Sequence, residues 1–247
     1  MEVNPTGPLR CPVLLGGVPL WLRLRYAETA AYFDRFRTDA ASPLPAAAMT
    51  DGDWALWRAM GHTDSAFGEF SMLPIRVSEA LMAYDRFILH AAAFRLRGRA
   101  YLITAGSGVG KTTQLWHLLS LLPGDAAVIC GDRPVIELCA DGSAVVHPSP
   151  WNGKEDLYGA DAAPLGGLIV LRRDGFNAFE SIDAQRAAPY VFASVFQSCE
   201  TEDSIRRAAN AASRLLESAA VYRLTSRDVP DSTRLMADAL CKEAIVP

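Results

Sequence analysis

The stretch YLITAGSGVGKTTQLW, residues 101–116, decides how the rest of the chain is interpreted. It begins as an apolar run, passes through a short bend and ends as a helical pattern. The bend holds three glycines and is followed at once by a lysine and two threonines: Gly106, Gly108, Gly110, Lys111, Thr112 and Thr113. Glycine is used where the backbone takes φ values that side chains resist, so consecutive N–H groups can turn toward one point. The stretch therefore predicts a strand, an anion-binding loop and a helix.

The bend matches the Walker A pattern, with Ala105 in the place of the first glycine. A polyphosphate would be held by the loop N–H groups and by the N-terminus of the helix that follows. We expect Lys111 to reach the β- and γ-phosphates, and the Thr112 hydroxyl to bind Mg²⁺. Without nucleotide, we expect the Lys111 side chain to be exposed. The predicted cofactors are ATP and Mg²⁺, and the predicted nucleotide-binding residues are Gly106, Ser107, Gly108, Val109, Gly110, Lys111, Thr112 and Thr113.

A second element supports nucleotide binding. The run AAVICGD, residues 126–132, reads as a buried strand that ends on Asp132. P-loop proteins place a carboxylate directed at Mg²⁺ at such a strand end. We therefore predict that Thr112 and Asp132 bind the metal.

The composition bounds the class of protein. The chain has 247 residues, half of them hydrophobic, and a net charge of −4, so nucleic acid is not an expected partner. The five cysteines show no C-x-x-C spacing and the four histidines form no close pair, which disfavours a disulfide framework or a zinc site and fits a reducing compartment. The apolar run at residues 11–24 is broken by glycine and proline and is too short to span a bilayer. With no secretory signal pattern, we expect a cytoplasmic protein that has no membrane partner.

The patterns predict an α/β chain with a small N-terminal lobe. Alternating leucines at residues 20–24 predict a strand, residues 38–52 read as a loop, and the apolar spacing in 75–85 predicts a helix. We assign residues 1–85 to this α+β lobe and expect it to provide an acceptor groove or an oligomer interface.

Residues 86–247 form the predicted core. Apolar runs on both sides of Gly98 predict paired strands, a hairpin is expected to turn at Asp141 and Gly142, and LGGLIVLRR predicts a buried strand. Helices are predicted near 184–196 and 202–219, and a last helix near 231–244 is expected to be capped by Asp231.

With these residues placed, the sequence resembles the HPr kinase-like P-loop family, in particular small bacterial members that include kinases encoded beside lasso-peptide precursors. The resemblance covers about residues 69–240. It is carried by EALMAYDRFILHAAAF, AGSGVGKTTQLW, GDRPVIEL, HPSPWNGKEDL, APLGGLIVLRRDGFNAFE and RAAPYVFASVFQ. It implies a P-loop nucleotide-binding core in which ATP donates its γ-phosphoryl group to a hydroxyl in the presence of Mg²⁺.

The resemblance also implies catalytic roles for individual residues. Asp132 and His90 would lie near the reacting group, Lys154 would contact the transferring phosphate oxygens, and Arg172 would stand at the end of its strand. Each has a structural alternative: a satisfied core histidine, a solvated loop lysine and an ordinary charged strand end. Trp151 would be either core packing or a wall for substrate.

One position departs from the pattern of the family. The relatives carry paired acids in DDxP, whereas this chain has Gly131, Asp132, Arg133 and Pro134. We expect Gly131→Asp to raise the rate if the backbone there accepts a side chain.

Three functions are compatible with these patterns. The first is a kinase that phosphorylates a hydroxyl of a peptide, a protein or a small molecule. The second, suggested by Gly131, is a nucleotide-binding recognition module without catalysis in a peptide-modifying pathway. The third, a relative of ATP-dependent phosphoenolpyruvate carboxykinase, is disfavoured because the sequence shows no ligand cluster for a transition metal.

Overall fold

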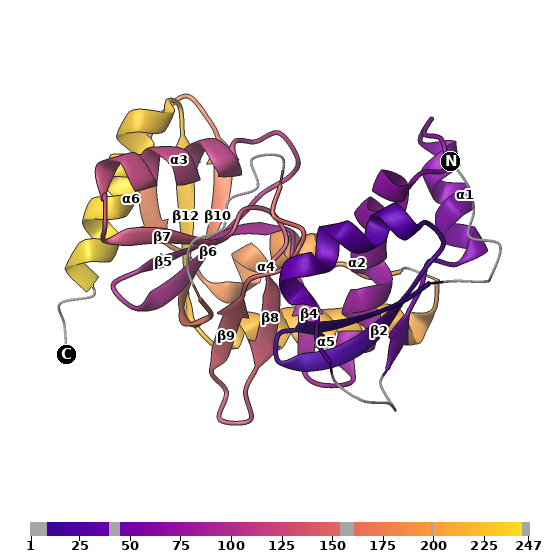
Figure 1. Cartoon of the computed structure of the whole chain (residues 1–247). Helices are drawn as coiled ribbons and strands as arrows, with labels where there is room; N and C mark the ends of the chain where they lie inside the picture. Colours follow the sequence, from indigo (N-terminus) through magenta and orange to yellow (C-terminus); the bar gives the residue numbers. More distant parts are fainter. Residues whose placement is uncertain (1–8, 40–44, 154–160, 199, 244–247) are drawn as a thin grey trace.

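The computed structural model describes residues 9–39, 45–153, 161–198 and 200–243, and it has a mixed α/β fold. Two lobes lie side by side: the first third of the chain builds one, and most of the remainder builds the other around a larger sheet (Figure 1). The functional residues predicted from the sequence belong to the larger lobe. The part of the fold that concerns function is therefore the edge of the larger sheet where these residues lie.

The smaller lobe starts with an antiparallel hairpin of β1 (Leu9–Leu15) and β2 (Val18–Leu24), whose turn residues Gly16 and Gly17 both have positive φ. The strand predicted at residues 20–24 is thus confirmed as part of β2, and the preceding apolar run is the hairpin itself. The other elements of this lobe are the 3₁₀ helix η1 (Ala27–Phe36), β3 (Ala46–Ala47), α1 (Asp51–Ala59) and α2 (Ala66–Met82). The helix predicted from residue 75 is the second half of α2, and the loop predicted at 38–52 also contains β3 and the start of α1.

The core of the smaller lobe does not end at residue 85. Phe33 and Leu73 pack in one buried cluster with Ile88, Val135 and Trp151, which come from the larger lobe. The two lobes therefore share apolar contacts, and the domain boundary at residue 85 stays a prediction.

The larger lobe is built on a sheet with the strand order β7–β5–β6–β10–β12–β11. Strands β6, β10 and β12 run parallel, and β7 has the same direction because β5 is antiparallel to both of its neighbours. The bounds are β5 (Ala91–Leu96), β6 (Arg99–Thr104), β7 (Ala126–Cys130), β10 (Ala163–Arg173), β11 (Ala178–Ser181) and β12 (Ala220–Ser226). The strand pair predicted around Gly98 is confirmed as β5 and β6.

A smaller antiparallel group of strands joins the two lobes. It consists of β4 (Arg86–Ile88), β8 (Val135–Leu138) and β9 (Ala144–His147), and β9 pairs with the first residues of β10. The hairpin predicted at Asp141 and Gly142 is confirmed as the β8–β9 turn, with Gly142 at positive φ.

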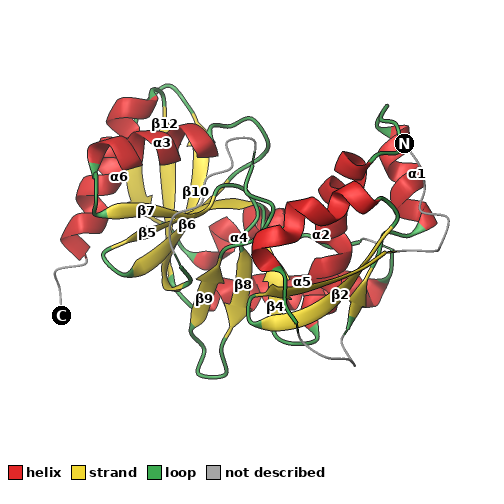
Figure 2. Cartoon of the chain, viewed as in Figure 1, coloured by secondary structure: helices red, strands yellow, loops and turns green. Residues whose placement is uncertain are grey.

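Helices cover both faces of the large sheet (Figure 2). α3 (Lys111–Leu121) and α6 (Val229–Glu243) pack on one face, and α4 (Ala184–Ser194) and α5 (Glu202–Glu217) on the other. The predicted cap of the last helix was wrong. The helix begins at Val229, and the Asp228 carboxylate, not that of Asp231, accepts the N–H of Asp231 at 3.3 Å. Pro230 is tolerated so early in a helix because the first N–H groups have no intrahelical partner.

The strand directions bring the predicted site residues to one edge of the sheet. The glycine-rich loop of residues 105–110 is called the P-loop because its sequence matches the Walker A pattern. This loop follows β6, Asp132 follows β7 and Arg172 stands near the end of β10, so all lie at the carboxyl edge. His90 precedes β5, which runs the opposite way, and it therefore reaches the same edge. In the described ranges, no helix has the length and apolar character needed to cross a membrane.

Candidate functional site

The P-loop has the backbone geometry that its glycines predict. Gly108 has φ 75° and Gly110 has φ 114°, both in the region that L side chains resist. Gly110 is the N-cap of α3 and offers no side-chain cap, so the first N–H groups of this helix have no partner from a cap side chain. A helix N-terminus in this state favours an anion through its free donors and its dipole.

Lys111 is buried, which corrects the expectation that its side chain would be exposed without nucleotide. The residue is 7% exposed, and its Nζ donates to the Ala105 carbonyl at 3.1 Å and lies 3.0 Å from His90 Nε2. Burial lowers the pKa of Lys111, and the nearby charge of Asp132 offsets this only in part. The ammonium is thus folded back against the loop in a place that penalises its charge.

His90 and Asp132 lie together beside this lysine. His90 Nε2 is 3.3 Å from Asp132 Oδ1, and Arg133 Nε donates to Asp132 Oδ2 at 3.0 Å. Burial raises the pKa of Asp132, but the hydrogen bond with His90 and the charge of Arg133 outweigh it and leave the pKa below its ordinary value. The carboxylate is therefore ionised at neutral pH, the state that was expected from the sequence.

The His90 backbone is held by hydrogen bonds with Ser194 and Thr104. Its N–H donates to the Ser194 carbonyl at 2.7 Å, and its own carbonyl accepts from Thr104 Oγ1 at 3.1 Å. Thr104 and Ser194 are also hydrogen-bonded to each other at 2.7 Å. The end of β6, the start of β5 and the end of α4 thus hold the position of His90.

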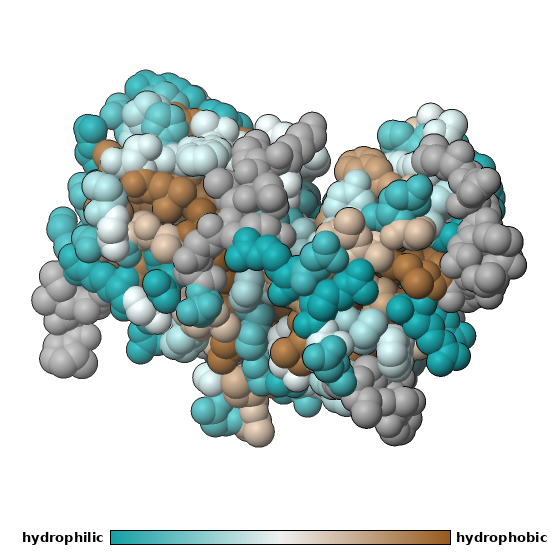
Figure 3. All heavy atoms as spheres, in the orientation of Figure 1, coloured by the Kyte–Doolittle hydropathy of each residue, from teal (hydrophilic) through white to brown (hydrophobic). Residues whose placement is uncertain are grey.

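These groups line a cleft of about 460 Å³ beside the P-loop. In the space-filling view the outline of the molecule is indented between the two lobes (Figure 3). The lining consists of His90, Ser107, Gly108, Gly110, Lys111, Thr112, Thr113, Asp132, Arg133, Gly153 and Phe196. The structure therefore places most of the predicted nucleotide-binding residues, together with His90 and Asp132, around one cavity.

Three residues of this lining were not predicted as site residues from the sequence: Arg133, Gly153 and Phe196. Arg133 donates from Nη1 to the Ser71 carbonyl of α2 at 2.9 Å, and its guanidinium lies 4.9 Å from the centre of the Phe196 ring. Arg133 thus connects the smaller lobe to Asp132. In the sequence, Arg133 could have been noticed because it directly follows Asp132, the acid at the strand end. Phe196 follows α4, and no sequence pattern marks it as a site residue.

Arg173, and not Arg172, contacts the P-loop. Arg173 Nε donates to the Val109 carbonyl at 3.0 Å. Side chains alternate along β10: Ile169 and Leu171 face α3 and α6, whereas Leu168 and Val170 face α4 and α5. This alternation puts Arg173 on the face of α3. Neither Arg172 nor Arg173 is among the residues that line the cleft in the described part of the chain. A catalytic role for Arg172 stays a prediction.

The structure gives a steric reason for the glycine at position 131, and the condition attached to Gly131→Asp, a backbone that accepts a side chain, is not met. A Cβ on Gly131 would lie 2.3 Å from the backbone oxygen of Asn152, a distance that real Cβ atoms do not show. The Gly131 N–H also donates to Asn152 Oδ1 at 2.7 Å. The backbone of residue 152 thus occupies the space that an acid would need, and a side chain there requires the loop to move.

Trp151 belongs to the packing between the lobes. It is 2% exposed, its Nε1 donates to the Phe70 carbonyl at 2.7 Å, and its ring meets those of Phe33 and Phe70. This favours the interpretation as core over that as a substrate wall. Lys154, the other candidate of this loop, lies outside the described residues.

The donor set at the cleft fits Mg²⁺. The Thr112 hydroxyl and the ionised Asp132 carboxylate are hard oxygen ligands, and Mg²⁺ in nucleotide sites takes one or two such ligands, with waters and phosphate oxygens for the rest. No group of three or more His, Cys, Asp and Glu in the described ranges could hold a metal without such outside ligands.

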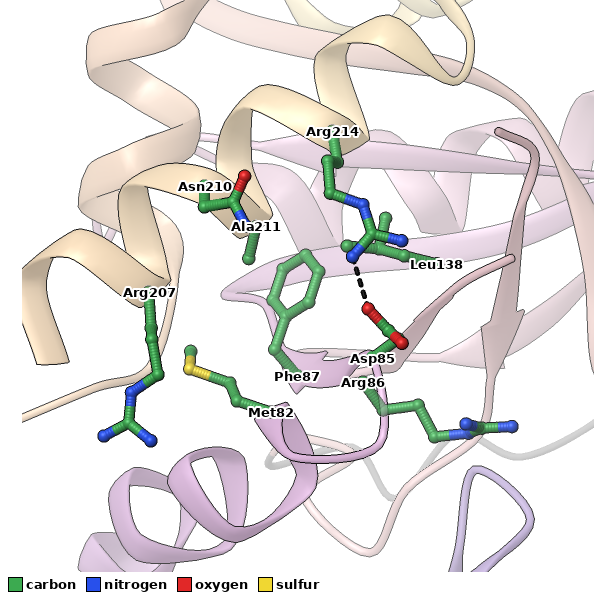
Figure 4. A pocket seen from close by; sticks show the side chains of 9 residues that line it. All are labelled: Met82, Asp85, Arg86, Phe87, Leu138, Arg207, Asn210, Ala211 and Arg214. Atoms are coloured by element: carbon green, nitrogen blue, oxygen red, sulfur yellow. Dashed lines mark hydrogen bonds and ion pairs between the residues drawn. The ribbon is translucent and has the colours of Figure 1, made fainter. Parts of the chain in front are cut away.

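A second pocket, of about 80 Å³, lies between α5 and β4 (Figure 4). Three arginines surround it, and each already pairs with a carboxylate: Arg86 with Glu137, Arg207 with Asp203 and Arg214 with Asp85. Figure 4 shows Arg214 turned toward Asp85. Because its charges are balanced within the chain, this pocket is a poorer candidate than the cleft.

Comparisons with known proteins add little to this geometry. No family model and no curated protein matches the chain. Among solved structures, the chain is similar to the Hpr(Ser) kinase/phosphatase from Coxiella burnetii, with 14% identity and a TM-score of 0.35 over 63% of this chain and 97% of that chain. So distant a likeness supports no conclusion about activity or substrate.

Proposed function

We propose that this protein is an ATP- and Mg²⁺-dependent kinase that transfers the γ-phosphoryl group to a hydroxyl of a peptide, a protein or a small molecule. One observation carries the proposal: the uncapped N-terminus of α3, formed at Gly110, opens onto the same cleft as the ionised Asp132. An anion site beside a fixed carboxylate suits the transfer of a charged group to a neutral nucleophile.

The residues in and beside the cleft have separate roles in this reaction. The P-loop N–H groups bind the phosphates, and Lys111 leaves its contacts with Ala105 and His90 to pair with the incoming charge. Arg173 adds positive charge at the far side of the loop. The acceptor oxygen bonds to the γ-phosphorus as the bond from that phosphorus to the β–γ bridging oxygen breaks, and Asp132 or His90 takes the hydroxyl proton.

The metal would be held by Thr112 and Asp132, and when bound it would neutralise charge on the phosphate oxygens. Asp132, with a lowered pKa, is a weak base. A loose transition state asks little of the base, because bond formation to the nucleophile lags behind departure of ADP. A single carboxylate is therefore enough for a slow kinase.

We further propose that the acceptor enters from the smaller lobe. Arg133 joins α2 to the cleft through the Ser71 carbonyl, and this link supports an acceptor that is held by the smaller lobe near Asp132. The identity of the acceptor and an oligomer interface in this lobe stay predictions. The cysteines in the described ranges, Cys11, Cys130, Cys139 and Cys241, are free thiols, which fits the proposal that the protein works in the cytoplasm.

The decisive experiment compares Asp132→Asn with Asp238→Asn, which changes an exposed carboxylate on α6. ADP release is measured with ATP, Mg²⁺ and candidate acceptors. The acceptors are peptides encoded by neighbouring genes and hydroxyl-bearing small molecules that the neighbouring genes suggest. Asp132→Asn removes a metal ligand as well as the base, so it should lower acceptor-dependent turnover at least about 100-fold, the lower end of the contribution of a positioned base alone. ATP binding without Mg²⁺ should persist in this variant, and Asp238→Asn should match the wild type.

Two results would contradict the proposal. If Asp132→Asn turns over like the wild type, Asp132 is not at the centre of the reaction. If the wild type binds ATP but releases no ADP with any of these acceptors, the protein is a nucleotide-binding module without catalysis.

A further inference from the structure

The direction in which ATP lies follows from the strand order, if the proposed function holds. The γ-phosphate must lie near Asp132 and His90, which are on the β5 and β7 side of the P-loop. β6, which carries the P-loop, has β5 on that side and β10 on the other. The nucleoside end of ATP must therefore leave the P-loop toward the ends of β10 and β12.

A short, well-anchored loop occupies that place. It spans residues 174–177, between β10 and β11. At its start, the Asp174 N–H donates to the Ser226 carbonyl at 3.3 Å. At its end, Asn177 Oδ1 accepts from the N–H groups of Arg227 at 2.7 Å and Asp228 at 3.2 Å. The loop that follows β12 thus holds the loop that follows β10.

The loop of residues 174–177 is also connected to the P-loop, through Arg173, the residue that precedes it. Besides donating to the Val109 carbonyl, Arg173 lies so close to Gly110 that a Cβ there would be 3.0 Å from Arg173 Nη2. The guanidinium therefore lies against the last turn of the phosphate loop, on the side opposite Asp132. It adds positive charge where the α-phosphate end would pass.

The anchored loop presents an aromatic ring to solvent. Phe176 is 54% exposed, although both ends of its loop are fixed. It is three residues from Arg173, which is at most about 10 Å of chain. Aromatic rings are stacking platforms for nucleobases, because every base has a π face.

We propose that Phe176 is the nucleobase subsite of this protein, and that Arg173 binds the phosphate that lies next to the nucleoside. The ligand class is a nucleoside triphosphate whose base stacks on the Phe176 ring. Because stacking reads the face of a base and not its edge, this subsite favours a nucleoside triphosphate over inorganic triphosphate without selecting one base.

The test separates the base from the phosphates. Binding of ATP and of inorganic triphosphate is measured by calorimetric titration for the wild type, Phe176→Ala and Phe176→Trp. Phe67→Ala is the matched control, because Phe67 lies on α2 of the smaller lobe and is 59% exposed. We expect Phe176→Ala to weaken ATP binding by about tenfold or more, which corresponds to about 1.4 kcal/mol, and to leave triphosphate binding unchanged. Phe176→Trp and Phe67→Ala should bind ATP like the wild type.

The outcomes distinguish this inference from the proposed function. If the wild type binds neither ATP nor inorganic triphosphate, the proposed function itself fails. If the wild type binds ATP and Phe176→Ala binds it equally well, only the subsite is overturned. An equal loss of ATP and triphosphate in Phe176→Ala would also overturn it, because the ring would then support the P-loop and not the base.

Discussion

Two cations, the partly buried Arg76 in the smaller lobe and the buried Lys111 at the cleft, are placed in opposite surroundings. The Arg76 guanidinium is held by three carboxylates: Asp53 at 2.8 Å, Glu79 at 3.0 Å and Glu200 at 2.6 Å. Lys111 Nζ has a carbonyl, a histidine nitrogen and, further off, the charge of Asp132. The hydrogen bond with Asp53 raises the pKa of Arg76, whereas burial lowers that of Lys111.

The charge of Arg76 is structural, because carboxylates within the chain balance it, whereas the charge of Lys111 is not fully balanced. Burial of a cation is costly unless anions and hydrogen bonds surround it. Arg76 has this compensation within the chain, and its network ties α1 and α2 to the segment around Glu200. Lys111 does not, so an anion that enters the cleft would supply the missing charge. A buried cation with too few acids around it is thus a better marker of an anion site than a buried cation as such.

The largest expected effect comes from removing the compensated cation. Arg76→Met would leave Asp53, which is 4% exposed, as an unpaired buried charge. We expect the free energy of unfolding to fall by about 3–5 kcal/mol, measured by urea denaturation. Arg58→Met, which removes an exposed partner of Asp64, should cost at most about 1 kcal/mol. Similar losses in both variants would show that the network of Arg76 contributes no more to stability than an exposed ion pair.

A smaller effect is expected at the P-loop, and it concerns ATP binding and not stability. Lys111→Met keeps most of the side-chain length and removes a charge that burial penalises. The free energy of unfolding should therefore stay unchanged or rise, whereas ATP binding should weaken by about 1.5–3 kcal/mol with the loss of a charged hydrogen bond. Calorimetric titration and urea denaturation measure the two quantities, with Lys242→Met as the control on the exposed end of α6. Equal ATP affinity in wild type and variant would show that Lys111 does not contact phosphate.

The smallest effect tests the packing that forms the cleft. In Gly131→Ala the new methyl group meets the Asn152 carbonyl, and overpacking of this kind costs about 1–3 kcal/mol. Gly52→Ala is the matched control, because the nearest atom to its Cβ would be at an ordinary 3.5 Å. Thermal unfolding of both variants measures the difference. A Gly131→Ala variant as stable as Gly52→Ala would mean that the loop of Asn152 moves easily, and Gly131→Asp would again be a candidate for a faster rate of the proposed reaction.

The sequence by itself determined the local features of this protein. The conformation of the glycine-rich loop could be predicted because glycine φ values depend on adjacent residues, and the strands and helices around the loop follow from short-range periodicity. Asp132 was found for the same reason, as the acid at the end of an apolar run.

Tertiary structure alone decided which side chains meet. Arg173 contacts Val109, and Arg133 contacts Ser71, across long stretches of the chain. These contacts and the burial of Lys111 depend on how distant elements pack together, including which helices cover which face of the sheet. Gly131 shows this most clearly. In the sequence it reads as a missing acid, but the Asn152 oxygen fills the space where its side chain would be, and a contact across 21 positions leaves no local pattern.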